Sequence, residues 1–392
     1  MESILWSMAR FAILLLAPFL AGAQNPGGPA RFETHTIASG LRGGYQVVAA
    51  DLNHDGKPDL IALGQGMSEL VWFENPTWER HVLATGVSQM VNCVVLDGGA
   101  EIVLASGFSQ RARDSKGIVS VLRPDGDVRR PWTATEIDRL PTTHRLRLAR
   151  IDAGPRVVVS APLTGADAEP PDYKGNTPLV YYRPGEWKRR MISDENTGIA
   201  HGLLIFDWDG DGRDEILTAS FTGIHLFRLE NDGRWTRTQL AAGDPAPWPK
   251  SGSSDMAVGS LSGKRFLAAI EPWHGNQVSI YRLLEGKWVR QTIEDKLSDG
   301  HALLTADLNG NGRDEVLAGF RGQGGSVYLY TAADAAGERW TRETLDGSMN
   351  AAACAAVDLN GDGRIDIACI DGTRLKWYEN RGPAAPTAAP RP

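Results

Sequence analysis

Short apolar runs alternate with turns along the whole chain, in a pattern that returns about every 50 residues. Each unit begins with two apolar runs joined by a glycine-containing turn, as at 47–50 and 60–63. A third run follows, usually with aromatic residues, and then a segment in which polar and apolar residues alternate. Alternation with a period of two is typical of a strand with one buried face. The pattern therefore predicts four strands in each unit.

The number of these units can be counted from two independent series of positions. The glycine-containing turns, complete or shortened, begin near residues 51, 97, 152, 207, 260, 307 and 358. An aromatic residue is followed five positions later by Ile or Leu at 32–37, 78–83, 132–137, 187–192, 235–240, 288–293 and 340–345. Both series count seven, and four-stranded sheets repeated at this spacing are typical of a propeller. We predict an all-β, seven-bladed β-propeller over residues 30–381.

The order of the segments also predicts how the ring closes. The alternating segment at 32–37 comes before the first pair of apolar runs, whereas the last unit stops after its third run. We therefore expect the N-terminal strand to complete the last blade. Such closure removes the free sheet edge that a linear array would leave exposed.

The two ends of the chain differ in composition from this repeat. Residues 1–23 resemble a secretory signal peptide, because an apolar run at 11–20 follows Arg10 and leads to Ala21-Gly22-Ala23. We therefore expect an exported protein, periplasmic or extracellular, without a membrane span after cleavage. Residues 382–392 are rich in Pro and Ala and are expected to be disordered.

Charge and cysteine content narrow the possibilities further. The net charge is −7, so the basic footprint of a nucleic-acid-binding protein is absent and we expect no nucleic-acid partner. The chain has 3 Cys, an odd number that argues against a disulfide framework. A bridge between Cys354 and Cys369 remains possible, because they would lie on neighbouring strands. Cys93 is expected to be a small buried apolar residue.

Four of the turns share a nine-residue acidic frame, with oxygen-bearing side chains at positions 1, 3, 5 and 9 and Gly at position 6. Oxygen ligands around a sharp turn suit calcium, and the loop is too short for an EF-hand. We predict three or four structural calcium ions, since the third loop below has two Asn in place of Asp. The alternative is an Asp/Gly-rich turn without metal. The predicted ligands are Asp51, Asn53, Asp55, Asp59; Asp207, Asp209, Asp211, Glu215; Asp307, Asn309, Asn311, Glu315; and Asp358, Asn360, Asp362, Asp366.

These hairpins resemble the FG-GAP repeats, also called VCBS repeats, which occur in bacterial secreted proteins and in the integrin α-subunit propeller. The resemblance covers nearly the whole chain after residue 23 and implies a calcium-binding propeller. It says little about activity, because the scaffold carries many functions. The second, third and fifth units lack the acidic loop, so we expect no calcium there.

Reactive side chains gather at the end of the predicted channel opposite the calcium loops. They lie just before the innermost strands or between the second and third strands of a blade. The candidates for catalysis are His201, His274, His301, Asp255, Glu271 and Arg321. The candidates for ligand binding are Tyr45, Gln46, Asn92, His144, Arg145, Lys250, Trp273 and Asn350. The concentration of His, Asp, Glu and Arg on the fourth to sixth blades favours a small-molecule site over a broad protein-binding face.

Two kinds of chemistry fit this set. Two or three His with a carboxylate could hold a divalent metal such as zinc or manganese. Without a metal, His and a carboxylate could act as general base and acid, with Arg145 or Arg321 stabilising an anionic oxygen.

Different classes of function therefore stay open. The first is a binding module whose channel face holds a carbohydrate, with Tyr45, Trp248 and Trp273 as flat surfaces for sugar rings, or a protein. The second is a sugar lyase or dehydratase. The runs His201-Gly202, 271–275 and 300–302 are similar to the propeller part of the aldos-2-ulose dehydratase family. That resemblance implies a carbon–oxygen lyase acting on a sugar.

Overall fold

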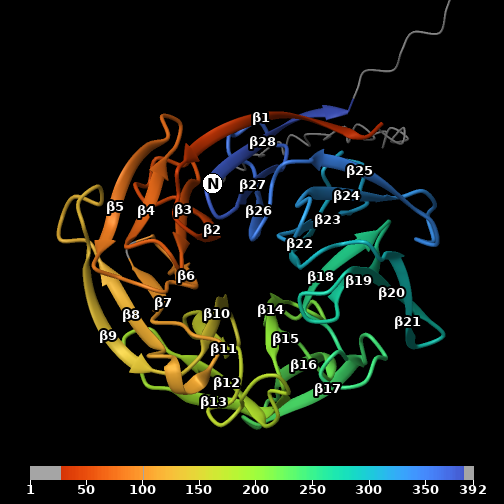
Figure 1. Ribbon diagram of the computed structural model, residues 1–392, viewed down its shortest axis with the longest axis horizontal. Coiled ribbons are helices and arrows are strands. Elements are labelled where there is room, and N and C mark those ends of the chain that lie inside the picture. The colour runs from red at the N-terminus through yellow and green to blue at the C-terminus, as the bar shows by residue number, and fades with distance from the viewer. Residues whose placement is uncertain (1–27, 100, 384–392) are drawn as a thin grey trace, which may run out of the picture.

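Seven four-stranded antiparallel sheets surround a central channel in the computed structural model, which describes residues 28–99 and 101–383 (Figure 1). The predicted all-β, seven-bladed propeller is confirmed. One short 3₁₀ helix, η1 (Ala112–Asp114), lies between the second and third strands of blade 2. Within the described ranges, no helix has the length and apolar character needed to cross a membrane.

The strands of blades 1 to 4, from the channel outward, are β2 (Gly44–Ala50), β3 (Asp59–Gly64), β4 (Glu69–Glu74), β5 (Glu79–Thr85); β6 (Asn92–Val95), β7 (Ile102–Ser106), β8 (Ile118–Arg123), β9 (Thr133–Arg139); β10 (Thr143–Ala149), β11 (Val157–Pro162), β12 (Asn176–Tyr182), β13 (Arg190–Thr197); and β14 (Ala200–Phe206), β15 (Glu215–Ser220), β16 (Gly223–Leu229), β17 (Trp235–Ala241). Those of blades 5 to 7 are β18 (Asp255–Leu261), β19 (Lys264–Glu271), β20 (Gln277–Leu284), β21 (Lys287–Glu294); β22 (Gly300–Ala306), β23 (Glu315–Phe320), β24 (Val327–Ala332), β25 (Trp340–Asp346); and β26 (Ala353–Val357), β27 (Asp366–Ile370), β28 (Arg374–Pro383), β1 (Ala30–Ser39).

The N-terminal strand closes the ring, as predicted. β1 pairs antiparallel with β28, with Phe32 opposite Asn380 and Ser39 opposite Arg374, and the two lie side by side in Figure 1. β28 continues two residues past the predicted boundary at 381, to Pro383, which faces Ala30. The predicted signal peptide and the rest of the predicted tail lie outside the described residues.

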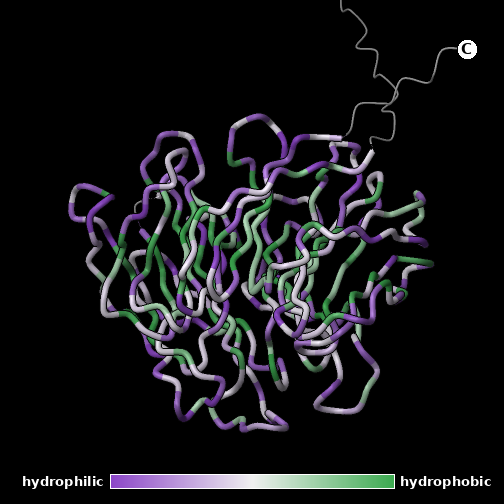
Figure 2. The backbone as a smooth tube through the Cα atoms, turned by 45° about the horizontal axis from the view of Figure 1, so that its top comes forward, coloured by the Kyte–Doolittle hydropathy of each residue, from purple (hydrophilic) through white to green (hydrophobic). Residues whose placement is uncertain are grey.

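The core lies between neighbouring blades. Figure 2 shows hydrophobic residues along the strands and hydrophilic ones at the turns. The middle strands are buried on both faces, as in β3 and β15, whereas the outer β9 is largely exposed. Large aromatic side chains such as Trp72, Phe227 and Tyr378 are completely buried. Burial of this kind supplies most of the stability of a propeller.

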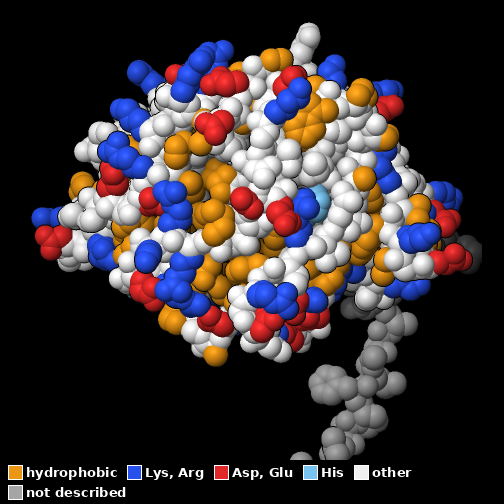
Figure 3. Space-filling view, turned by 90° about the horizontal axis from the view of Figure 1, so that it is seen from below, with side chains coloured by type: hydrophobic (Ala, Val, Ile, Leu, Met, Phe, Trp, Pro, Cys, Tyr) orange, Lys and Arg blue, Asp and Glu red, His pale blue; other side chains and the backbone are white. Residues whose placement is uncertain are grey.

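Two further predictions about the surface and the cysteines can be compared with the structure. Cys354 and Cys369 face each other on β26 and β27 and form a disulfide, while Cys93 is a buried free thiol. On the side of the molecule shown in Figure 3, Lys and Arg lie beside Asp and Glu over most of the surface. The expectation that the protein has no nucleic-acid partner stays a prediction.

Candidate functional site

Four innermost strands each place one functional side chain at the same end of the channel. Tyr45, His144, His201 and His301 are the second residues of β2, β10, β14 and β22. In each of these strands the pairing register shifts at that residue, as between Gly44 and Gln46. Such irregularities turn a side chain away from the regular alternation of the sheet. Four blades therefore direct these side chains toward one point.

His144, His201, His274 and His301 form a compact cluster there. The ring centre of His201 lies 4.8 Å from that of His144, 5.0 Å from that of His274 and 4.9 Å from that of His301. The rings of His144, His201 and His301 are almost completely buried. The Nε2 atoms of His201 and His274 are 3.4 Å apart. The sequence had predicted the meeting of His201, His274 and His301, and had placed His144 among the ligand-binding residues.

Backbone carbonyls orient two of these rings. His201 Nδ1 lies 3.2 Å from the carbonyl oxygen of Ser254, and His301 Nδ1 contacts that of Ala352. A carbonyl oxygen accepts only, so each Nδ1 carries the proton and each Nε2 keeps its lone pair. This is the arrangement seen in metal-ligating histidines, whose other nitrogen donates to a carbonyl.

The hydroxyl of Tyr45 lies between two of the rings. It is 2.9 Å from His144 Nε2 and 3.1 Å from His301 Nε2. His144 Nδ1 is buried and has no hydrogen-bond partner in the described part of the chain. The Tyr45 proton can therefore point to either imidazole, and the choice decides whether His301 Nε2 is free for another ligand.

The environment keeps these imidazoles neutral. Burial, reinforced by nearby cationic groups, lowers the pKa of His144, His201 and His301 well below the usual range. Burial, followed by Arg321, lowers the pKa of His274 to about 4, and Asp299 opposes the shift. Neutral imidazole is the form that ligates a metal or accepts a proton.

His274 reaches the cluster through a close backbone contact between blades 5 and 6. Gly300 N donates to Gly275 O at 2.9 Å, and a Cβ on Gly300 would lie 2.9 Å from that oxygen. His274 and Asp299 both have left-handed backbones, with φ of 49° and 60°. Backbone strain of this kind is common at functional sites.

Asp299 is a site residue that sequence reasoning missed. Its Oδ1 lies 3.3 Å from His274 Nδ1, and Arg321 contacts the same carboxylate with two nitrogens at 3.0 and 3.1 Å. Arg321 Nη2 is also 3.3 Å from His274 Nδ1. The signal available in the sequence was the position of Asp299, two residues before His301.

A second charged group lies beside the imidazoles. A small cavity of about 50 Å³ is lined by Gln46, Arg145, Arg147, Asp255 and His301, among others. Arg145 is buried, its Nη1 has no partner among the described residues, and its Nη2 is 3.5 Å from His201 Nε2. Burial raises the pKa of Asp255, whereas Arg145 and Arg147 act in the opposite direction.

Several predicted site residues lie elsewhere. Glu271 is completely buried within blade 5, where its carboxylate accepts hydrogen bonds from Ser253, Tyr281 and Arg290, so the structure does not bring it to the cluster. It is the last residue of β19, the second strand of blade 5, and is not part of the connection at the channel mouth. The remaining three residues also have other surroundings: the Asn92 side chain accepts from Leu146 N, Asn350 donates to Arg321 O at the rim, and Lys250 is exposed.

Aromatic side chains form a wall around the imidazoles. Trp273 lies 4.7 Å from His274 and 5.6 Å from Tyr173, measured between ring centres. Phe108 lies 5.4 Å from His144. Trp273 was predicted, whereas Phe108 and Tyr173 were missed because they belong to long loops whose position the repeat pattern does not determine.

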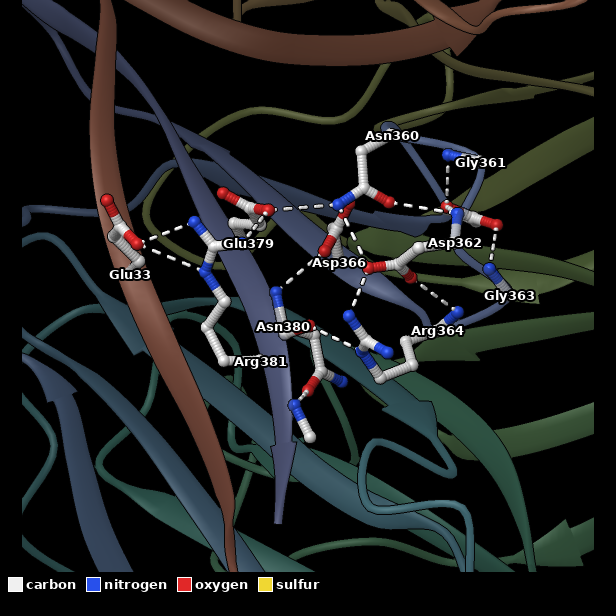
Figure 4. A network of polar contacts seen from close by, with 12 residues as sticks. Glu33, Asn360, Gly361, Asp362, Gly363, Arg364, Asp366, Glu379, Asn380 and Arg381 are labelled. Atoms are coloured by element: carbon white, nitrogen blue, oxygen red, sulfur yellow. Dashed lines mark hydrogen bonds and ion pairs between the residues drawn. The ribbon is translucent and has the colours of Figure 1, made fainter. Parts of the chain in front are cut away.

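The four acidic loops share one hydrogen-bond pattern. In blade 7, Asp358 accepts from the backbone N–H groups of Gly361, Asp362 and Gly363, and Asp366 accepts from that of Leu359. Asp366 also accepts from Asn380 N, as Figure 4 shows. In the other three loops the first and ninth carboxylates accept from the equivalent N–H groups. The ninth side chain is therefore buried, while the third and fifth face outward.

The blade 4 loop brings its carboxylates closest together. Asp207, Asp209 and Asp211 each offer an oxygen within 4.8 Å of the other two. Arg213 and Arg228 form ion pairs with Asp211 and Asp209 and offset part of the charge. Oxygen donors at this spacing fit the coordination shell of calcium.

Burial affects the ninth position most. Burial raises the pKa of Asp59 to about 6, although N–H donors from Asn75 and Leu52 oppose the shift. Burial likewise raises the pKa of Glu315 to about 7. A cation in the loop would favour the ionised carboxylates.

Arginines take the place of an acidic frame in two of the degenerate blades. Asp97 of blade 2 pairs with Arg156, and Asp152 of blade 3 pairs with Arg183. In blade 5 the backbone of Ser260 exchanges hydrogen bonds with Asp314 of the next blade. Each of these turns has an internal partner for its charge or backbone.

Three family profiles match parts of the chain. Residues 116–283 match the β-propeller domain of aldos-2-ulose dehydratase, residues 307–369 match an FG-GAP-like repeat, and residues 43–68 match an FG-GAP repeat. Both resemblances predicted from the sequence are confirmed. The first profile spans His144, His201 and His274 but ends before His301.

The chain is also similar to an aldos-2-ulose dehydratase of Phanerodontia chrysosporium, with 24% identity over 422 residues. The alignment covers 92% of this chain but 46% of that enzyme, so the chain spans less than half the length of its relative.

Among solved structures, BBS1N in complex with ARL6DN matches with a TM-score of 0.58 at 13% identity, covering 90% of this chain and 97% of that chain. A candidate 6-phosphogluconolactonase from Bacteroides fragilis matches with a TM-score of 0.51 at 15% identity, over 84% and 86% of the two chains. At such identities the likeness concerns the fold alone.

Proposed function

We propose that this FG-GAP-repeat β-propeller is an exported, metal-dependent lyase that dehydrates a keto sugar at the histidine cluster. The observation that carries the proposal is the convergence of neutral imidazoles with oriented Nε2 lone pairs. The similarity to an aldos-2-ulose dehydratase supports the choice of an aldos-2-ulose as substrate class. A carbohydrate-binding module without turnover would have no need of such a set.

The donor set fits zinc or manganese at His201, His274 and His301. Tetrahedral ligands at about 2.0–2.1 Å from zinc lie about 3.3 Å from each other, close to the 3.4 Å between the Nε2 atoms of His201 and His274. One ligand atom from each of the three histidines lies within 4.8 Å of the others. A metal held there would polarise a carbonyl oxygen of the sugar.

The residues around the imidazoles supply the rest of the chemistry. Dehydration next to a carbonyl breaks one C–H bond, forms a C=C bond and expels the neighbouring hydroxyl, which leaves as water after it is protonated. Tyr45 and His144 are the acid–base pair, because the hydroxyl and the neutral imidazole are already in hydrogen-bond contact. Arg145, whose Nη1 has no hydrogen-bond partner among the described residues, stabilises the oxyanion.

The acidic loops have a different role in this proposal. We place a structural calcium ion in each complete loop of blades 1, 4 and 7, and a weaker one in blade 6. These loops lie at the opposite ends of the innermost strands from the histidine cluster. Calcium would therefore stabilise the blades without touching the substrate.

Elemental analysis tests the proposal. Purified protein should contain one zinc or manganese per chain, and His201→Ala and His301→Ala should lose it while keeping the fold. His54→Ala, on the loop side of blade 1, is the matched control and should keep the metal. The same two variants should no longer convert a hexos-2-ulose to an unsaturated ketone. Ultraviolet absorbance of the product measures this conversion.

Retention of the metal in both cluster variants would overturn the proposed site. A metal-free protein that binds the sugar without converting it would assign the chain to the binding modules instead.

A further inference from the structure

A cleft lies next to the histidine cluster on the same end of the propeller, over blades 1 to 3. Its volume is about 620 Å³, within the range of about 300–1,000 Å³ that is usual for ligand pockets. The loops that follow the second strand in each of these blades supply most of its lining. The lining residues are Gln65, Gln89, Phe108, Ser109, Gln110, Arg111, Asp114, Pro170 and Tyr173.

Two aromatic residues are shared between this cleft and the wall of the cluster. Phe108 lines the cleft, and its ring centre is 5.4 Å from that of His144. Tyr173 lines the cleft as well and lies 5.6 Å from Trp273, which in turn contacts His274. The cleft therefore borders the aromatic wall of the cluster.

The polar lining is dominated by carboxamides. Gln65, Gln89 and Gln110 each present a group that donates and accepts at once, which matches the hydroxyl groups of a sugar. Within the described chain, none of these three amides makes a side-chain hydrogen bond to the protein. Arg111 and Asp114 contribute one charge of each sign, so the lining favours a neutral ligand over an anionic one.

The cleft is a defined feature of the fold. Gln89 and Tyr173 have left-handed backbones, with φ of 52° and 47°, although neither is glycine. Backbone hydrogen bonds keep them in place: Phe108 N donates to Gln89 O at 3.1 Å, and Tyr173 N donates to Glu169 O at 2.8 Å. Such conformations persist only where the surroundings enforce them, and they gather at functional sites.

Further contacts tie the loops of the cleft together. Arg113 of the blade 2 loop forms an ion pair with Glu169 of the blade 3 loop at 3.7 Å. Trp248 Nε1, from the segment that leads into blade 5, donates to Asp172 O at 2.7 Å beside Tyr173. The walls of the cleft are thus connected across blades 2, 3 and 5.

We infer that this cleft is a subsite for the non-reacting units of a neutral oligosaccharide, bordered by Tyr173 and Phe108 and hydrogen-bonded by the three glutamines. The protein then acts on the end of a chain of sugars. The inference rests on the proposed function only for the identity of the unit that reacts; binding in the cleft requires neither the metal nor turnover.

Calorimetric titration tests the subsite. The probes are glucose, maltotetraose, cellotetraose and mannotetraose with the metal-loaded protein. At least one tetrasaccharide should bind at least tenfold more tightly than glucose. The Gln89→Ala/Gln110→Ala double variant should lose most of that difference. Gln323→Ala, an exposed glutamine on the same end over blade 6, should bind as the unchanged protein does.

The metal-free His201→Ala variant separates the two proposals. It should still prefer the tetrasaccharide over glucose, because the cleft lies outside the cluster. Equal affinity for glucose and all three tetrasaccharides, or an unchanged preference in the double glutamine variant, would overturn the subsite. If the unchanged protein itself contains no zinc or manganese and still prefers a tetrasaccharide, the subsite stands and the lyase is refuted.

Discussion

The direction in which the Tyr45 hydroxyl donates its proton decides which imidazole nitrogens of the cluster are free. This hydroxyl contacts both His144 and His301, and His301 Nε2 can serve a metal only when the Tyr45 proton points to His144. Because Tyr45 is nearly buried, replacing it with Phe keeps the shape of the site and removes only the hydroxyl.

We predict that Tyr45→Phe keeps its zinc or manganese but converts a hexos-2-ulose about 100-fold more slowly, the usual effect of losing a general acid. The loss should appear in kcat, with KM changed much less. Tyr328→Phe, on β24 away from the channel, is the control. A variant that loses both metal and turnover would show that Tyr45 positions the ligands instead of transferring a proton.

Single residues also show where sequence reasoning stops. The equivalent positions of His201 and His301 before two innermost strands were sufficient to predict that they meet. Glu271 was assigned from its place in the connection that carries His274, and that assignment failed because Glu271 still belongs to the second strand of blade 5, where the protein binds its carboxylate. Asp299 and Tyr173 could not be found, since their left-handed backbones are set by tertiary contacts rather than by local sequence.

At the scale of elements, one carboxylate forms hydrogen bonds between blades 6 and 7. Asp346 at the end of β25 accepts hydrogen bonds from Lys376 and Tyr378 of β28 at 2.6 and 2.8 Å. Burial alone would raise the pKa of Asp346, but the bonds from Lys376, Ser348 and Tyr378 outweigh it and lower the pKa to about 2.

A lowered pKa in the folded state means stability that is present above the unfolded value of about 3.9 and is lost as pH falls toward 2. We predict that Asp346→Asn costs roughly 2–4 kcal/mol at pH 7, because Lys376 is left buried without its partner. The difference from the unchanged protein should shrink between pH 4 and 2 in urea unfolding. A difference that does not change over that interval would contradict the role of the ion pair.

The acidic loops are the second element with a measurable role. We expect chelation with EDTA to lower the free energy of unfolding by about 2–3 kcal/mol for each calcium site, if the free calcium concentration before chelation is about 100 times the Kd of that site. Asp207→Asn/Asp211→Asn should remove one calcium per chain and part of the EDTA effect. Asp152→Asn in blade 3, where Arg183 pairs with the aspartate, should leave the calcium content unchanged. An identical melt with and without EDTA would remove calcium from the proposal.

The loops and strands were easier to predict than the site because they follow the repeat. Periodic burial determines each blade, and the fourth strand of blade 7 was found from its alternation at 32–37 alone. The mouth of the channel is built from the long connections of blades 2, 3 and 5, which share no period. Contacts such as Gly300 with Gly275 arise only when neighbouring blades pack against each other.

At the scale of the whole molecule, closure depends on β1. Eight residue pairs join it to β28, and the ionic network of the blade 7 acidic loop continues into it. Arg381 forms ion pairs with Glu33 of β1 and with Glu379 (Figure 4). His35 of β1 also lies 2.9 Å from Glu379. The last blade is therefore complete only when the first strand of the chain has returned to it.

We predict that a chain lacking residues 28–39 loses about 4–8 kcal/mol of stability, at roughly 0.5–1 kcal/mol for each pairing position. The exposed edge of β28 should also make it associate. A synthetic peptide of residues 28–39 should bind that edge as an added strand and restore the melting temperature, whereas a peptide with Phe32 and Ile37 replaced by Asp should not.

Deletion of 384–392 is the control and should leave the melt unchanged. If the shortened chain melts as the full one does and ignores the peptide, the ring is held by blade-to-blade packing alone, and β1 is only a cover on its outer edge.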